Sequence, residues 1–396
     1  MSINTYLPIV VGESHYNTLG LIRSFGEGGY EPILILIIHT ERDKKSFITK
    51  SKYINKYYYS TEEKLIDDLN KINLSGSKGV IFPSGDSIAN IIDESRNRLS
   101  TKFLTPLFNK RGGYFAVAND KERMRLRAEN FGFKTPKTWI ITKDTQINNL
   151  DIEFPVIIKS LHSQDAPKSF NIYDNIKTLS RDIQELFKLT PEVQVQSYLV
   201  KEKEIIYLGY SYNDEVCIPC VMEKKREFPN GFGGTGLGVF YPDVNKYFDI
   251  STLYHLIKSY KYDGLFSVEF IIHNDIPYFL EINFRNDGNG YFPGYGGVNL
   301  PVNLLHRYEG KQNQKHLYIT SSFIMMREYN DFKWVIDNKY PLKDWLADIR
   351  RTDVFQYWNK NDKKPFFAFI SSHLKDSIKN KISILNKKLN IPHILL

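Results

Sequence analysis

Residues 266–285, FSVEFIIHNDIPYFLEINFR, contain two glutamates, an asparagine and an arginine at odd-numbered positions. They are Glu269, Glu281, Asn283 and Arg285. Carboxylates on a sheet otherwise rich in Phe, Ile and Tyr cost free energy, because a buried carboxylate without a partner takes up a proton. A hard divalent cation offsets that cost, and magnesium is commonly held by one or two carboxylates. The stretch therefore predicts a magnesium site; the alternative is an acidic sheet face open to solvent.

Two strands joined by a short polar turn would position these side chains. Period-two alternation places Ser267 and Glu269 on one face of the first strand. It places Glu281 and Asn283 on one face of the second strand. A hairpin that turns through residues 273–276 brings the two polar faces together, so the predicted ligands meet on one sheet.

The composition is that of an ordinary soluble globular protein. The chain has 396 residues, of which 42% are hydrophobic, so it can bury more than one core. Two cysteines and no signal-like N-terminal segment favour the cytoplasm. No apolar run near the N-terminus approaches the roughly 18 residues of a spanning helix. The net charge is +8, but the scatter of Lys and Arg argues against nucleic-acid binding.

Strand-like and helical segments alternate in the first 115 residues. The strand-like runs are residues 7–11, 33–38 and 79–82. This alternation predicts a Rossmann-like α/β domain. The turn after the first strand, GESHYN, lacks G-x-G-x-x-G spacing, which argues against a dinucleotide site. Residues 83–86 follow the third strand at the edge where open sheets bind ligands, and the alternative there is a helix cap at Asp86.

Two further segments carry cations suited to an anionic substrate. Residues 154–159, FPVIIK, form an apolar strand that ends in Lys159, a positioned cation. Residues 231–238, GFGGTGLG, fit G-x-G-x-x-G formally but run into VFYPD rather than a helix, so a dinucleotide site is excluded. We expect a mobile loop that closes over an anionic substrate. Lys225 and Arg226 lie in the basic stem of this loop and are candidates for binding a substrate carboxylate, because the two N–H groups of a guanidinium can bind both carboxylate oxygens.

Cys217 and Cys220 have C-x-x-C spacing, but neither a second pair nor a histidine cluster completes four zinc ligands. Residues three apart in a strand face opposite sides, so we expect both to be packing residues.

The C-terminal tail combines an apolar face with lysines opposite. The apolar positions are Leu374, Ile378, Ile382, Leu385 and Leu389. A basic amphipathic helix either lies on an anionic membrane surface or docks on its own protein, and peripheral membrane association is one of the two interpretations.

Taken in chain order, the candidate residues resemble the ATP-grasp superfamily. The resemblance is carried by Lys121, Lys159, residues 196–204, Glu269 and the run E-I-N-F-R at 281–285. That run is similar to the E-x-N-x-R pattern of the biotin-carboxylase and carbamoyl-phosphate-synthetase branch. More narrowly, the chain resembles the D-aspartate ligase group of carboxylate-amine ligases. The motifs are N-x-L-G-x-x-R at 17–23, the turn at 83–86, K-R-x-x-P at 225–229, G-V-N-x-P at 297–301 and K-K-P at 363–365.

The resemblance implies an α/β (α+β) chain with the ATP-grasp fold, an N-terminal Rossmann-like domain and a small C-terminal α+β extension. The implied boundaries are 1–115 for the Rossmann-like domain, 116–310 for the ATP-grasp domain and 311–396 for the extension. Within the ATP-grasp domain, residues 116–190 form the first lobe, and residues 191–310 form the second lobe with the metal site.

The resemblance also implies an ATP site. Lys121 and Lys159 would touch the phosphates, and Glu204 would hold the ribose hydroxyls. Adenine would lie beside Gln196 and meet backbone groups of Ser197 and Leu199. Glu269, Glu281 and Asn283 would hold one or two magnesium ions, with manganese as an alternative, and Arg285 would stabilise an acylphosphate.

These roles imply an ATP- and magnesium-dependent ligase that joins a small-molecule carboxylate to an amine. The nearest resemblance suggests addition of an amino acid to a cell-wall precursor, and modification of a peptide or surface polysaccharide fits equally. Residues 160–169, SLHSQDAPKS, contain no glycine, whereas the family's loop is usually glycine-rich. The alternative is therefore a degenerate ATP-grasp protein that binds nucleotide without ligase turnover.

Overall fold

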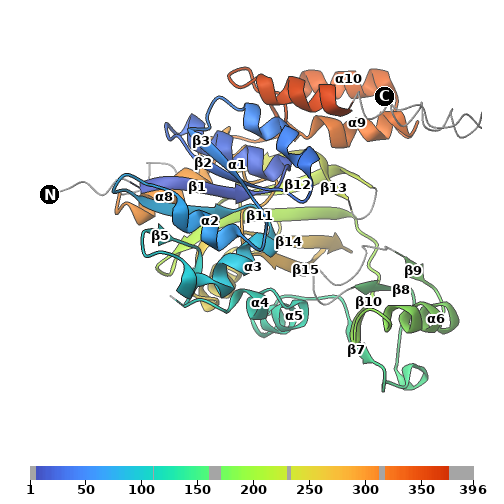
Figure 1. Ribbon diagram of the computed structural model, residues 1–396. Coiled ribbons are helices and arrows are strands. Elements are labelled where there is room, and N and C mark those ends of the chain that lie inside the picture. The colour runs from blue at the N-terminus through green and yellow to red at the C-terminus, as the bar shows by residue number, and fades with distance from the viewer. Residues whose placement is uncertain (1–5, 110, 160–170, 230–232, 312–316, 374–396) are drawn as a thin grey trace, which may run out of the picture.

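A computed structural model describes residues 6–109, 111–159, 171–229, 233–311 and 317–373 (Figure 1). The glycine-free loop at 160–169 and the amphipathic tail from Leu374 onward lie outside these residues. No helix in the described ranges is long and apolar enough to cross a membrane.

The N-terminal domain is a five-stranded parallel sheet with the order β3-β2-β1-β4-β5. Its strands are β1 (Tyr6–Gly12), β2 (Ile33–Ile37), β3 (Lys56–Ser60), β4 (Lys78–Pro83) and β5 (Phe103–Leu104), with helices α1 (Tyr16–Glu27), α2 (Leu65–Lys71) and α3 (Asp86–Glu94). Every residue of β2, ILILI, is buried, as expected for a strand covered on both faces. The predicted Rossmann-like domain is confirmed.

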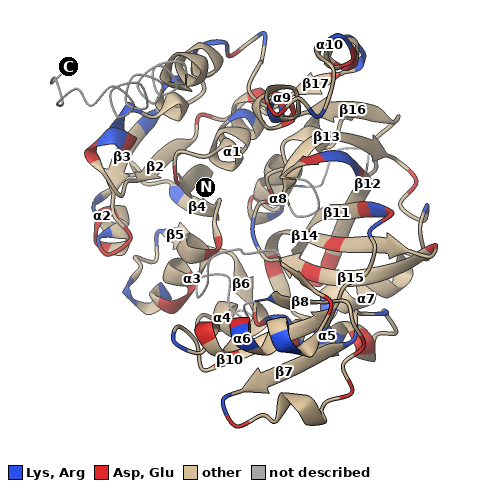
Figure 2. Ribbon diagram, turned by 90° about the vertical axis from the view of Figure 1, so that its right-hand side faces the viewer, with Lys and Arg blue, Asp and Glu red and all other residues tan. Residues whose placement is uncertain are grey.

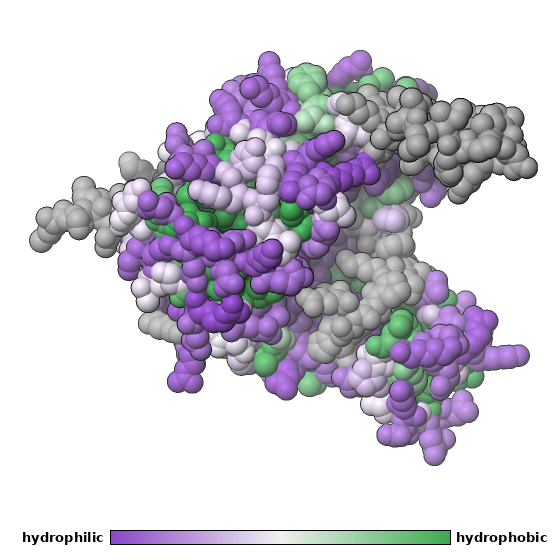
Figure 3. Space-filling view, in the orientation of Figure 1, coloured by the Kyte–Doolittle hydropathy of each residue, from purple (hydrophilic) through white to green (hydrophobic). Residues whose placement is uncertain are grey.

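A four-stranded sheet with the order β7-β10-β8-β9 forms a separate lobe. Its elements are β7 (Thr138–Thr142), β8 (Val156–Lys159), β9 (Ile172–Tyr173), β10 (Glu192–Ser197) and α6 (Ile176–Leu186). The lobe has its own apolar core between α6 and the sheet. Figure 3 shows it projecting at the lower right. Because β10 pairs with β7 and β8, the crossing to the next sheet comes after residue 197 rather than at the predicted boundary of 190.

An eight-stranded sheet forms the centre of the molecule, in the order β15-β14-β11-β12-β13-β16-β17, with β6 paired to β14. The strands are β6 (Leu107–Phe108), β11 (Lys203–Tyr212), β12 (Glu215–Phe228), β13 (Gly234–Tyr241), β14 (Tyr262–His273), β15 (Ile276–Asn283), β16 (Phe323–Met326) and β17 (Val354–Phe355). One face shares a core with α1 and α8 (Leu300–Tyr308), and the other shares one with α4 (Phe115–Ala118), α5 (Lys121–Asn130) and α7 (Ser251–Ser259).

The C-terminal extension adds β16 and β17 to the central sheet, places α9 (Glu328–Ile336) beside β12 and β13, and packs α10 (Leu342–Arg351) against α9 (Figure 1). Residues 364–373 are also helical. Short 3-10 turns complete the described elements at Glu41–Lys45, Phe47–Lys50, Arg96–Arg98, Ile147–Asn149 and Phe292–Gly294.

Two local predictions are wrong. The glycine-rich segment is not a loop through residue 238, because β12 runs on to Phe228 and the chain returns as β13 from Gly234. Cys217 and Cys220 do not face opposite sides of the sheet. A β-bulge pairs Leu208 with Cys220 and Tyr210 with Cys217, so both thiols enter the same core cluster. Both are free and buried, so their role as packing residues is confirmed.

Candidate active site

The predicted hairpin is confirmed. β14 and β15 are joined by Asn274 and Asp275, whose φ angles of 51° and 60° suit a two-residue turn that follows the twist of the strands. The register places Glu269 opposite Glu281, and the neighbouring Ser267 lies opposite Asn283. The hairpin thus places two carboxylates directly opposite each other, and their negative charges repel unless a cation or a proton lies between them.

The pKa of Glu269 is strongly raised. It reaches about 8, chiefly because of burial and also because of the charges of Glu281 and Glu204, while Lys224 acts in the opposite direction. Asn283 donates one amide hydrogen bond to Glu269 Oε1 at 3.2 Å and another to Ser267 Oγ at 3.2 Å. Without a cation, Glu269 therefore holds a proton at neutral pH.

The donor set is small. Among the residues that the structure describes, no group of three or more His, Cys, Asp and Glu side chains could hold a metal ion. A cation between Glu269 and Glu281 would take two carboxylates and the Asn283 amide from the chain. Waters and substrate phosphates would have to complete its shell, which is the pattern of magnesium rather than of calcium or zinc.

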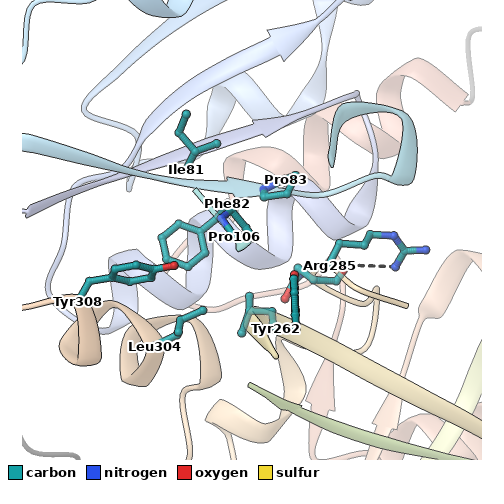
Figure 4. Close-up of a pocket in the computed structure, with 10 residues that line it drawn as sticks. Ile81, Phe82, Pro83, Pro106, Tyr262, Arg285, Leu304 and Tyr308 are labelled. Atoms are coloured by element: carbon teal, nitrogen blue, oxygen red, sulfur yellow. Dashed lines mark hydrogen bonds between the residues drawn. The ribbon is translucent and has the colours of Figure 1, made fainter. Parts of the chain in front are cut away.

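Arg285 lies just beyond β15 and faces the N-terminal domain. Its guanidinium pairs with Asp86 through Nε to Oδ1 at 2.9 Å and Nη2 to Oδ2 at 3.3 Å. It also donates from Nη2 to Asn283 Oδ1 at 3.2 Å. Figure 4 shows its side chain extending away from the apolar residues that fill the domain junction, among them Phe82 and Tyr262. The turn at 83–86 therefore takes part in the site through Asp86.

Lys121 and Lys159 come together from different elements. Lys121 is the first residue of α5, and Lys159 ends β8 opposite Gln194 of β10. The pKa of Lys159 is lowered to about 8, chiefly by burial and then by the charge of Lys121. Glu281 and Glu269 act in the opposite direction, so Lys159 is within electrostatic reach of the hairpin carboxylates.

The predicted adenine contacts gather where the four-stranded lobe joins the central sheet. Gln196 is buried on β10 and donates to Thr138 Oγ1 at 3.1 Å. The amide of Ser197 donates to Lys137 O at 2.8 Å, so this N–H is engaged in the lobe. Leu199 lies in the short connection from β10 to β11. The structure brings the three residues together at this connection.

Glu204 belongs to a cluster of alternating charge at the start of β11. Its carboxylate accepts from Lys201 Nζ at 2.7 Å and from Lys224 Nζ, and Lys201 also pairs with Glu227. Although burial favours the neutral acid, Lys224 and Lys201 hold the pKa of Glu204 below its usual value. In Figure 2 charged positions, drawn blue and red, occur on the neighbouring strands β11, β12, β14 and β15 of the central sheet.

Lys224 is a site residue that the sequence prediction missed. It pairs with Glu204 and interacts electrostatically with Glu269, so it lies between the two carboxylates. The sequence assigns the neighbouring Lys225 and Arg226 to the basic stem of a loop, whereas β12 continues to Phe228. Continuing the period-two alternation from Met222 would have placed Lys224 on the face that carries the other site residues.

Lys225 and Arg226 are placed differently from Lys224. Lys225 pairs with Glu223 at 2.5 Å, and Glu223 also accepts from Tyr247 at 2.8 Å, on the sheet face opposite Lys224. Arg226 is engaged by α9 and α10. It binds Asp331 through Nε at 2.9 Å and Nη2 at 2.7 Å, and Asp348 through Nη1 at 2.7 Å. Their predicted grip on a substrate carboxylate stays a prediction.

The chain has the ATP-grasp fold, preceded by a Rossmann-like domain and followed by a small α+β extension, as the sequence predicted. The sequence matches no protein-family model. Among solved structures, it is similar to N5-carboxyaminoimidazole synthetase from Staphylococcus aureus, with a TM-score of 0.61 and 17% identity over 85% of this chain and 88% of that one.

Two further solved structures have the same architecture. The L-amino acid ligase from Bacillus licheniformis gives a TM-score of 0.58 at 10% identity, over 80% of this chain and 79% of that one. The biotin carboxylase domain of Hydrogenobacter thermophilus 2-oxoglutarate carboxylase, in complex with MgADP, ADP and bicarbonate, gives 0.61 at 15% identity, over 80% and 73%. At these identities the likeness defines the fold, and the chemistry has to be argued from the site.

Proposed function

We propose that the chain is an ATP- and magnesium-dependent ligase that joins a carboxylate to an amine through an acylphosphate. The observation that carries the proposal is the opposed pair Glu269 and Glu281, which interacts electrostatically with Lys159, itself a neighbour of Lys121. Two carboxylates for a cation and two lysines for phosphates are the parts that phosphoryl transfer needs. The ADP and MgADP complexes of similar structures support the same nucleotide and metal.

In the proposed complex, Lys121 and Lys159 neutralise the phosphates and Glu204 accepts from the ribose hydroxyls. Glu204 is now held by Lys224 and Lys201, so ribose binding would replace one of those contacts. Gln196, Ser197 and Leu199 would bind adenine. Glu269, Glu281 and Asn283 would hold one or two magnesium ions, which when bound neutralise charge on the transferred phosphoryl group.

The proposed chemistry has two steps. A substrate carboxylate oxygen forms a bond to the γ-phosphorus, and the bond to the β-phosphate oxygen breaks, which releases ADP. The amine then attacks the acyl carbon, phosphate leaves, and the amine loses a proton. Arg285 and Lys159 would stabilise the negative charge that both steps develop, because fixed cations in a site shielded from water need no reorganisation.

Magnesium affinity is expected to depend on pH. The raised pKa of Glu269, about 8, means that this carboxyl is mostly neutral below pH 8 and must lose its proton to bind a cation. Affinity should therefore rise between pH 6 and pH 8 and level off above. Isothermal titration of Mg²⁺ at pH 7 in two buffers of different ionisation enthalpy should detect proton release. An affinity that is flat across this range would contradict the assignment of Glu269.

Adjacent lysines on opposite faces of β12 provide a matched comparison. Lys224→Met removes the cation between Glu204 and Glu269, so kcat/KM should fall by roughly 10²-fold or more. Lys225→Met removes a half-exposed cation on the other face, and we expect the smaller effect there. Steady-state phosphate release measures kcat/KM for both variants. A larger loss with Lys225→Met would support the substrate contact predicted from the sequence.

The direct test is phosphate release from Mg-ATP with a panel of amino acids paired with amines and carboxylates. Release that needs both substrates supports the ligase. Normal binding of ATP without release for any pair favours the degenerate nucleotide-binding protein instead.

The substrate pair and location are part of the proposal. The proposed reaction takes place in the cytoplasm and joins an amino acid such as D-aspartate to a cell-wall or surface-polymer precursor. The resemblance to the D-aspartate ligase group supports this choice of substrates. The proposed membrane contact through residues 374–396 is tested by sedimentation with anionic liposomes, which deletion of these residues should abolish.

A further inference from the structure

The loop at residues 356–362 is held from beneath by two charged side chains. Arg23 of α1 is fully buried, donates to three backbone oxygens of the loop at 2.7–3.0 Å, and pairs with the Asp362 carboxylate at 3.1 Å. Glu328, the first residue of α9, accepts from the backbone amides of residues 356–358 at 2.7–3.2 Å. These charge-assisted contacts fix the backbone of the loop, so it can present side chains at defined positions.

This loop and the helix at residues 364–373 present two aromatic side chains to solvent. The helix packs on the protein through Phe369, whose ring stacks on that of Tyr357 with 4.1 Å between the ring centres. Phe367 lies on the other side of the helix and is 59% exposed, and Trp358 of the loop is 37% exposed. Their ring centres are 6.3 Å apart. Exposed aromatic side chains that gather on a fixed support mark an interaction surface.

The charges around the two aromatic rings are positive. Lys363 Nζ lies 5.9 Å from the ring centre of Trp358. Lys52, also exposed, adjoins the loop, because its backbone amide donates to Asp362 at 2.9 Å. The loop and the start of the helix contribute three exposed lysines: Lys360, Lys363 and Lys364. Two of them belong to the K-K-P motif, to which the proposed ligase chemistry gives no role.

The carboxylates bonded to this loop offset little of that charge. Asp362 is matched by Arg23. Glu328 is enclosed by backbone amides, and burial raises its pKa. Glu27 is exposed and accepts from Asn359 at 2.7 Å. Of these three, Glu27 alone presents a negative charge to solvent, so the surface around the aromatic rings keeps a positive net charge.

The apolar positions of the tail have the helical phase of Phe367. Leu374 comes seven residues after Phe367, close to two turns of an α-helix, and Ile378 and Leu385 come close to three and five turns after it. A helix continued at this period would place the apolar face of the tail on the exposed side, away from the packed Phe369. The tail also has five lysines and one aspartate. Of the two interpretations of the tail, this phase favours a membrane surface over its own protein.

We propose that Trp358, Phe367 and the three lysines form a docking surface for an anionic lipid bilayer, on which they lie beside the tail. This inference rests on the proposed function, because it extends the membrane contact proposed for residues 374–396 to residues of the folded chain. Lysines near a bilayer are attracted by acidic headgroups, and aromatic side chains are enriched at the boundary between headgroups and acyl chains. The rigid loop would also fix the orientation of the enzyme on the bilayer.

The test is co-sedimentation of the full chain with vesicles made of equal parts of phosphatidylcholine and phosphatidylglycerol. Binding to these vesicles and much weaker binding to pure phosphatidylcholine are expected. Lys363→Glu combined with Lys364→Glu should lower the partition coefficient by about tenfold or more, because each lysine near an anionic surface adds to the attraction. Phe367→Ser should lower it by roughly fivefold, because an inserted aromatic ring is lost.

Matched controls come from the four-stranded lobe. Leu189→Ser changes an apolar side chain that is 65% exposed, and Lys143→Glu combined with Lys177→Glu reverses two exposed lysines. Both control proteins should bind the vesicles like the parent. Equal losses in these controls and in the variants at Lys363, Lys364 and Phe367 would overturn the proposed surface.

Direct contact is measured by fluorescence. Brominated phosphatidylcholine in the anionic vesicles should quench the tryptophan emission of the parent, and Trp358→Phe should remove that quenching. The other three tryptophans serve as an internal control, because none of them belongs to the proposed surface. Quenching that is the same in the parent and in Trp358→Phe would overturn the contact.

The outcomes separate this inference from the proposed function. Parental binding by the Phe367 and lysine variants, with binding lost on deletion of residues 374–396, would overturn the surface and leave the tail contact. A parent that ignores the vesicles but forms a dimer that Phe367→Ser disrupts would assign the surface to a second copy instead. Phosphate release is measured without lipid, so an inactive protein that still binds the vesicles would refute the ligase alone.

Discussion

Glu281→Gln is expected to abolish ligase turnover while leaving the protein at least as stable as the parent. The substitution removes one of two opposed carboxylates, and with it a ligand of the proposed magnesium ion. Metal stabilisation of a phosphoryl transition state amounts to several kcal/mol, so kcat should fall by roughly 10³-fold. The thermal midpoint without Mg²⁺ should stay constant or rise above pH 8, where Glu269 is charged and the substitution relieves its repulsion of Glu281.

Both measurements are needed to interpret this variant. Steady-state phosphate release gives kcat, and thermal unfolding with and without Mg²⁺ gives stability. Glu215→Gln is the matched control, since Glu215 begins β12 of the same sheet with a side chain 64% exposed and should alter neither quantity much. A Glu281→Gln protein with the parental kcat would contradict the metal site. A Glu281→Gln protein with a lower thermal midpoint than the parent would assign Glu281 a structural role.

The sequence predicted the hairpin well because its signals are local. Period-two alternation and a polar turn at Asn274 and Asp275 predict the two strands, but the register that sets Glu269 opposite Glu281 also depends on a β-bulge between Glu269 and Phe270. The sequence also singled out the lysine at the end of β8, because an apolar strand that ends in a lysine such as Lys159 is unusual in itself. These signals need only short-range physical chemistry, and so does the alternation of strand and helix segments that predicted the N-terminal domain.

The errors lie where pairing is non-local. Lys224, Lys225 and Arg226 look like a solvated loop stem, but β12 continues through them because β11 and β13 supply backbone partners and Glu204 supplies a counter-charge. The bulge that brings Cys217 beside Cys220 depends on the partner strand in the same way. No periodicity within one segment carries that information.

Arg226→Met is expected to destabilise the C-terminal extension strongly. Asp331 is fully buried, and Arg226 supplies two of its hydrogen bonds; Trp345 donates a third at 3.0 Å. Removing one partner of a buried ion pair typically costs about 3–5 kcal/mol, because the remaining charge stays uncompensated. Thermal unfolding should show a lower midpoint, and hydrogen exchange should accelerate in α9 and α10. Lys225→Met, next in the chain, should lower the midpoint less, because Lys225 is 40% exposed and Tyr247 still donates to its buried partner Glu223.

A neutralised variant separates a structural role for Arg226 from the substrate contact predicted from the sequence. If the loss comes from uncompensated carboxylates, Arg226→Met combined with Asp331→Asn and Asp348→Asn should regain much of the thermal stability, since amides cost less to bury than charges. KM for the carboxylate substrate should then stay near the parental value. A folded Arg226→Met protein with a normal midpoint and a KM raised tenfold or more would instead assign the guanidinium to the substrate. The two aspartates favour the first outcome, because they already occupy the fork that a substrate carboxylate would need.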